Sequence, residues 1–155
     1  MGQNEQERED LPLAKAATLL LEECRMVLPG IQALFGFQLI AVFSEGFSQK
    51  LSRFDQYLHF AAITLVTVAI ALVMAPAAYH RLTGPRKVSN QFVRLASGLL
   101  LASMLPLSLG ICLDLYIVST ALGLTVTGII VGGSLFLLYI TLWLLVPSMI
   151  RRRKQ

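Results

Sequence analysis

Two ionisable residues, Asp114 and His59, occur in long apolar stretches of this chain, and residues of these types can handle protons. A charged side chain at the centre of a membrane helix costs about 2.5–3.5 kcal/mol on insertion scales, so such residues usually have a role. A histidine can bind and release a proton near neutral pH. We expect Asp114 and His59 to lie at similar depth on antiparallel helices, as a proton-linked site or as a structural pair.

Other polar features of the same stretches could contribute to that site. Gln32 and Gln38 in the first stretch either line a water path or hydrogen-bond across helices, and the second role is the commoner one. Pro106 leaves the carbonyl of Ala102 free, which predicts either a cation ligand or only a kink. The candidates for proton- or ion-linked chemistry are therefore Asp114, His59, Pro106 and Gln32.

A second charged group occurs at the other ends of these stretches. Glu22 and Arg25 are three residues apart and can pair on one helix. A charge network here would either gate an inner vestibule or hold the N-terminal helix against the second loop. Its expected members are Glu22, Glu23, Arg25, His80, Arg81 and Arg94.

The apolar stretches must be the elements that position these residues. The chain has 155 residues, 55% hydrophobic and 14% charged, whereas soluble proteins carry about 25% charged residues. Each stretch is long enough to cross a hydrocarbon core of about 30 Å. We predict an all-α fold, a bundle of four transmembrane helices over about 26–43, 58–79, 95–118 and 122–146. Residues 11–150 would form this single transmembrane domain, between a disordered tail (1–10) and a basic tail (151–155).

Shorter patterns predict how the spans are connected. Apolar residues at helical spacing from Leu13 to Leu28 indicate an N-terminal amphipathic helix at the membrane surface, bent at Pro29 where it enters the first span. Phe47, Leu51, Phe54 and Leu58 predict a short surface helix in the first loop. A third loop of a few residues around Ser119 and Thr120 would make the last two spans a tight hairpin.

Small residues at spacings of four predict where helices touch, because they let backbones approach closely. The contact could lie within one chain or, less readily, between two copies. The residues expected to serve helix packing are Gly98, Ala102, Gly110, Gly128 and Gly132.

The distribution of positive charge predicts the orientation. All of the 13 Lys and Arg residues except Lys50 and Arg53 fall on the side of the two termini. The positive-inside rule therefore predicts cytoplasmic termini in the inner (plasma) membrane. Basic residues that flank apolar spans favour anionic lipids as partners rather than nucleic acid. No zinc spacing surrounds Cys24 or Cys112, and we expect neither a metal nor a cofactor.

Two motifs carry a family resemblance, namely residues 22–35 (EECRMVLPGIQALF) and 75–81 (APAAYHR). They resemble a family of short bacterial four-span membrane proteins of unknown function, some of which are labelled sodium–proton antiporters. The resemblance covers most of the chain from about Leu19 and implies a four-span membrane fold. It supplies no catalytic or binding residues. The positions that match the motifs are Glu23, Arg25, Pro29, Gln32, Pro76, His80 and Arg81.

These observations predict ion- or proton-linked transport. Because four short spans seldom enclose a pore alone, we expect the transporter to be an oligomer. The alternative is an accessory or scaffold subunit of a larger membrane complex. A third hypothesis is a protein that recognises the lipids of the inner leaflet by binding them with its surface helix and its basic tail. No phosphate-binding loop, HExxH or GxSxG motif is present, and we do not expect an enzyme.

Overall fold

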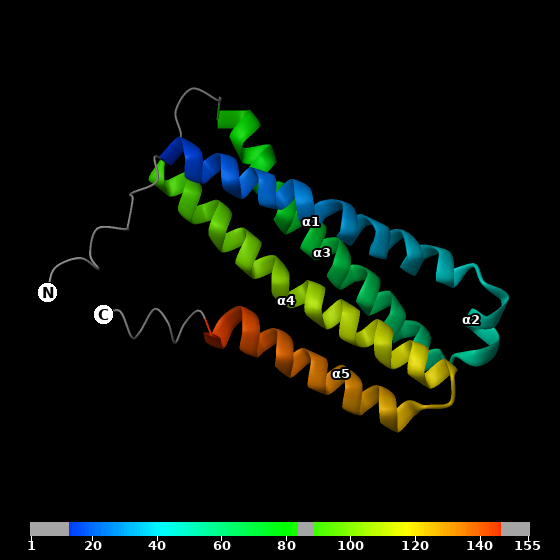
Figure 1. Cartoon of the computed structure of the whole chain (residues 1–155). Helices are drawn as coiled ribbons and strands as arrows, with labels where there is room; N and C mark the ends of the chain where they lie inside the picture. The colour runs from blue at the N-terminus through cyan, green and yellow to red at the C-terminus, as the bar shows by residue number, and fades with distance from the viewer. Residues whose placement is uncertain (1–12, 84–88, 147–155) are drawn as a thin grey trace, which may run out of the picture.

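A computed structural model describes residues 13–83 and 89–146, and all regular structure in these ranges is helical. Four long helices lie side by side (Figure 1), which confirms the all-α four-helix bundle. A short helix, α2 (Glu45–Lys50), lies between the first two of them, and a π-helical turn, η1 (Thr141–Leu145), continues the last. The long helices are α1 (Leu13–Val42), α3 (Arg53–Thr83), α4 (Asn90–Ala121) and α5 (Thr125–Ile140).

Each long helix is apolar and long enough to cross a membrane. At about 1.5 Å per residue, α3 and α4, with 31 and 32 residues, extend over about 45 Å and reach beyond a hydrocarbon core of about 30 Å. The chain is thus a multi-pass membrane protein. The expected tails, 1–10 and 151–155, lie outside the described residues.

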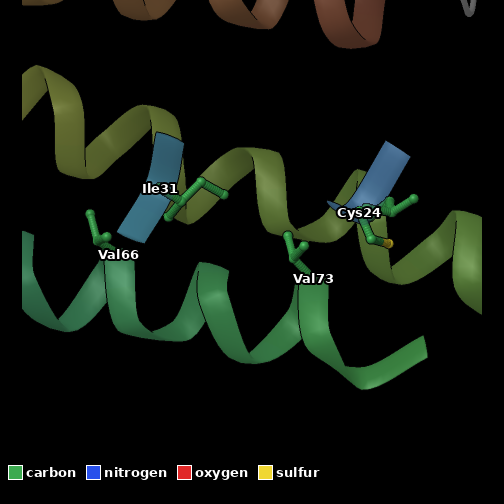
Figure 2. Packing of buried hydrophobic residues seen from close by; sticks show 5 residues of the cluster. Cys24, Ile31, Val66 and Val73 are labelled. Atoms are coloured by element: carbon green, nitrogen blue, oxygen red, sulfur yellow. The ribbon is translucent and has the colours of Figure 1, made fainter. Parts of the chain in front are cut away.

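The helices pack around a core of aliphatic side chains. α3 and α4 form the most extensive contact, α1 packs on both of them, and α5 packs on α4. Figure 2 shows Ile31 and Cys24 of α1 beside Val66 and Val73 of α3, and Leu100 of α4 belongs to the same buried cluster. The middle of the bundle is therefore filled by apolar groups.

The predicted N-terminal surface helix is not a separate element. α1 runs without interruption from Leu13 to Val42 and contains Pro29. The apolar face of its first half packs against the bundle, where Ala17 lies in one buried cluster with Phe92 and Ala96 of α4. A proline removes only one hydrogen bond from a helix, and membrane helices tolerate it when neighbouring helices support them. The amphipathic pattern thus reflects packing on protein rather than on lipid.

The first loop contains the predicted short helix, but this helix ends earlier than the predicted pattern does. α2 includes Phe47 and ends at Lys50, while Phe54 belongs to α3. α3 starts where it does because Ser52 and Asp55 cap it reciprocally. Asp55 N donates to Ser52 Oγ (3.2 Å), and an Asp55 carboxylate oxygen accepts from Ser52 N (3.2 Å) and Ser52 Oγ (2.6 Å).

The third loop lies three residues later than predicted. Ser119 and Thr120 belong to the last turn of α4, and the chain turns at residues 122–124. Gly123 has a φ of 77°, a left-handed conformation that glycine adopts without a steric penalty and that commonly ends helices. The tight hairpin of α4 and α5 is present as expected.

The two glycines of α5 pack within the chain. A Cβ atom on Gly128 would lie 2.6 Å from Cβ of Ser119, and one on Gly132 would lie 3.3 Å from the backbone oxygen of Cys112. These close approaches bring α5 against α4. The GxxxG pattern therefore serves the contact within one chain, as the sequence favoured.

Of the small residues predicted to serve helix packing in α4, the one in the second half of the helix is closely packed and the two in its first half are exposed. A Cβ atom on Gly110 would lie 2.9 Å from a methyl group of Val66, so α3 and α4 approach closely there. Gly98 has no atom within 4 Å of such a position, and both Gly98 and Ala102 are exposed. Steps of four residues turn about 40° around a helix, so a stripe from Gly98 to Gly110 winds through about 120°. Gly98 and Ala102 therefore do not serve close packing within one chain, and a contact of these residues between two copies stays a prediction.

Candidate functional site

Three polar side chains from three helices meet near one end of the bundle. Nε2 of Gln38 (α1) donates to Oδ2 of Asp114 (α4) at 2.7 Å. Nε2 of His59 (α3) lies 2.9 Å from the backbone oxygen of Gln38, and its Nδ1 lies 3.6 Å from Oδ1 of Asp114. Gln38 and His59 are buried, and 19% of the Asp114 side chain remains exposed. We call these three residues the outer triad.

The positions of these residues along their helices explain why they meet. Gln38 lies one turn before the end of α1, His59 lies near the start of α3, and Asp114 lies two turns before the end of α4. Because these helices are antiparallel neighbours along the chain, those positions share one level of the bundle. Gly110, one turn before Asp114, lets α3 and α4 come close enough for the contact.

The hydrogen bonds determine where a proton must lie. The backbone oxygen of Gln38 can only accept, so Nε2 of His59 must carry a hydrogen. In a neutral imidazole Nδ1 is then an acceptor, and it would face Oδ1 of Asp114, which is also an acceptor unless protonated. The contact is favourable only when the pair holds one proton, as imidazolium with carboxylate or as imidazole with carboxylic acid. One proton shared by His59 and Asp114 would therefore make the 3.6 Å approach of these two atoms favourable.

Two acceptor atoms of the outer triad have no partner among the described residues. They are Oε1 of Gln38 and Oδ1 of Asp114, and both are buried. A buried acceptor without a hydrogen bond is uncommon and often marks a place where a ligand, ion or water binds. The described residues include no group of three His, Cys, Asp or Glu side chains that could hold a metal ion.

A cavity of about 380 Å³ adjoins the outer triad. All three members line it, its walls are otherwise mainly apolar, and Lys50 of α2 contributes a basic group. A second cavity of about 440 Å³ lies on another side of His59 and is lined in part by Arg53 and Gln56. Phe47 borders both cavities and packs edge-on against His59, with ring centroids 5.2 Å apart. Phe47 of α2 therefore covers one side of the His59 ring.

The structure brings together two of the four residues named for ion-linked chemistry. His59 and Asp114 form the expected pair, but Gln32 is exposed on α1 and Gln38 takes its place. Six residues turn a helix by about 240°, so the two glutamines cannot point the same way. Pro106 lies eight residues, or about 12 Å, from Asp114 along α4 and does not line either cavity beside His59. Gln38 does form the cross-helix hydrogen bond that the sequence favoured.

The predicted charge network at the other end does not form as ion pairs. Within residues 13–83 and 89–146, His59 and Asp114 are the one pair at ion-pair distance, so Glu22 and Arg25 are not joined. A cavity of about 550 Å³ between α1 and α3 is instead lined by Arg25, His80 and Arg81. Glu22, Glu23 and Arg94 do not border it.

Comparison with known proteins identifies the family but adds no assigned residues. Neither the curated proteins nor the solved structures contain a significant match to the chain. A protein-family model described as a family of unknown function (DUF6328) matches residues 4–147. The match covers nearly the whole chain, including both motifs that carried the resemblance. The chain therefore belongs to this family of unknown function, DUF6328.

Proposed function

We propose that this membrane protein takes part in proton- or ion-linked transport and that the outer triad is its proton-binding site. The observation that carries the proposal is the approach of His59 Nδ1 to Asp114 Oδ1 at 3.6 Å while His59 Nε2 is already committed to the Gln38 carbonyl. One proton makes that contact favourable, and its loss leaves two acceptors facing each other. Such a site has two states that differ by one proton.

The neighbouring cavity supports transport over a purely structural role. A structural polar network in a membrane bundle normally satisfies all of its members, because an unsatisfied buried group is costly. Here Oε1 of Gln38 has no hydrogen-bond partner among the described residues, and Oδ1 of Asp114 has none apart from its 3.6 Å approach to His59. After deprotonation these two atoms and Nδ1 of His59 are three acceptors beside one cavity, which suits a small cation in exchange for the proton.

The apolar middle of the bundle bears on how transport would proceed. Ile31, Val66 and Val73 belong to one buried apolar cluster (Figure 2), which also includes Leu100. Along their helices these residues lie between the level of the outer triad and the opposite end. These side chains provide no polar path through one chain in this conformation. The proposal therefore includes either a rearrangement of the helices or an oligomer in which a second copy completes the path. It places both termini in the cytoplasm and the outer triad in the outer half of the membrane.

Proton flux into proteoliposomes tests the proposal. The purified full-length protein is reconstituted with an internal pH-sensitive dye, and a sodium, potassium or proton gradient is imposed. We expect flux from the natural protein and none above empty liposomes from Asp114→Asn. The matched control is Asp55→Asn, because Asp55 is a buried aspartate at the same end whose contacts are those of a helix cap. That variant should retain flux.

Two results would contradict the proposal. One is the absence of flux from the natural protein under all three gradients. The other is full flux from Asp114→Asn, which would make the outer triad a structural contact only. Gentle extraction followed by native mass spectrometry then separates the remaining roles, because an accessory subunit would retain foreign subunits whereas a self-sufficient transporter would appear as copies of one chain.

A further inference from the structure

The cavity at the opposite end of the bundle combines basic and apolar walls. It has a volume of about 550 Å³ and lies between the first half of α1 and the last third of α3. Arg25, His80 and Arg81 supply its polar lining, and Leu28 and Met74 are among its apolar residues. Both flanking helices are long and apolar enough to span a membrane, so the cavity lies between two candidate spans. We call it the inner groove.

The arginines of the inner groove are available to a ligand. Arg25 and Arg81 are both exposed, and neither has an ion-pair partner in the described part of the chain. Glu22 and Glu23 precede Arg25 on α1, yet their carboxylates pair with neither arginine. The His80 ring packs against Phe92 of α4, with centroids 5.6 Å apart, which holds it at the edge of the groove.

Small side chains shape the rest of the groove. α3 contributes Ala71, Ala75, Ala77 and Ala78 to its lining, and short side chains leave space between α1 and α3. From Arg81 to Ala71 the helix covers about 15 Å, directed from the basic end toward the membrane interior. The groove therefore changes from cationic to apolar along the direction in which a lipid molecule lies in a bilayer.

We propose that the inner groove binds one anionic phospholipid. Its phosphate lies between Arg25 and Arg81, and one acyl chain lies against Leu28, Met74 and the alanines of α3. Guanidinium groups bind phosphate oxygens through paired hydrogen bonds, and basic residues at the end of a membrane span attract anionic headgroups. A free phosphate would use only the arginines, whereas a lipid also covers the apolar wall. The site is separate from the outer triad and does not depend on a transport function.

Titration of the delipidated full-length protein with phosphatidylglycerol in detergent tests this inference, with bound lipid counted by native mass spectrometry. We expect one tightly bound phosphatidylglycerol and much weaker binding of phosphatidylcholine. Arg25→Gln combined with Arg81→Gln should weaken the binding about 30-fold, from the typical effect of two basic side chains near an anionic lipid. Arg94→Gln is the matched control, because Arg94 is an exposed arginine at the same end that does not line the groove.

A second variant tests the apolar wall without a change of charge. Ala78→Phe places a ring in the groove at an exposed position, so it should fold normally and bind phosphatidylglycerol several-fold more weakly. Equal binding of phosphatidylcholine, equal loss in Arg94→Gln, or unchanged binding in both groove variants would each overturn the proposal. Competition by glycerol 3-phosphate as strong as that by the lipid would also overturn it, in favour of a free phosphate site.

Discussion

The two ends of this bundle differ in how far their ionisable side chains are buried. At one end His59 and Asp114 are mostly covered and are joined to Gln38, whereas at the other Arg25 and Arg81 are exposed with no ion pair among the described residues. A buried charge must be paired or neutralised, while an exposed cation keeps its hydration and needs no protein partner. This difference in burial suits the first end to the proposed proton site and the second to the proposed anionic lipid. Variants at the first should change stability, and variants at the second should change ligand affinity.

The largest expected effect comes from the helix contact beneath the outer triad. Gly110→Leu would force a side chain against Val66 and the backbone of Ala62, and we expect a loss of about 3 kcal/mol, as in overpacked cores. Unfolding in mixed detergent micelles measures it. Gly98→Leu on the same helix has open space and should change stability little. Equal losses in both variants would mean that the close approach of α3 and α4 is unimportant.

The next effect separates the charge of Asp114 from its hydrogen bonds. Asp114→Leu leaves Nε2 of Gln38 and Nδ1 of His59 without a partner, and we expect a loss of about 2 kcal/mol in the free energy of unfolding. Asp114→Asn can still accept from Gln38 and can donate to Nδ1 of His59, so its stability should lie near that of the natural protein. A leucine variant as stable as the asparagine variant would contradict the triad as a bonded unit.

A smaller effect is expected when the aromatic ring that packs on His59 is removed, which would expose the outer end as the inner end is exposed. Phe47→Ala removes the ring that packs on His59, and aromatic contacts of this kind contribute about 1 kcal/mol. We also expect faster modification of His59 by diethyl pyrocarbonate, followed by mass spectrometry of peptides, with His80 as the internal reference. Phe54→Ala is the control, because Phe54 is exposed and borders neither cavity beside His59. An unchanged rate in Phe47→Ala would show that α2 does not cover the site.

The smallest effect belongs to the inner groove. Arg81→Gln should change the free energy of unfolding in lipid-free detergent by less than about 0.5 kcal/mol, because the arginine is exposed and unpaired within the described residues. The same measurement with Arg25→Gln should agree. A loss comparable to that of Asp114→Leu would show that the inner arginines hold the helices together, and the contrast between the two ends would fail.

The sequence predicted most of the fold and part of the site. Four apolar runs identified all four spans, because in a bilayer only helices satisfy their own backbone groups over such lengths. The sequence predicted the pairing of His59 with Asp114 because the two residues lie at similar depth in the membrane on spans that run antiparallel. The choice of Gln38 over Gln32 and the exposure of Gly98 depended on the rotation of each helix about its axis, which apolar composition does not encode when every face is hydrophobic.

The amino-acid sequence by itself determined that this chain is helical, that it spans a membrane four times, and which costly polar residues lie within the spans. Hydrophobicity and length suffice for those conclusions, since they concern each segment separately. Only the tertiary structure decided that α1 is one helix packed on α3 and α4, that Gln38 completes the outer triad, and that Arg25 and Arg81 border one groove. Those outcomes depend on which helix faces meet, and close packing at positions such as Gly110 and Gly128 selects the faces.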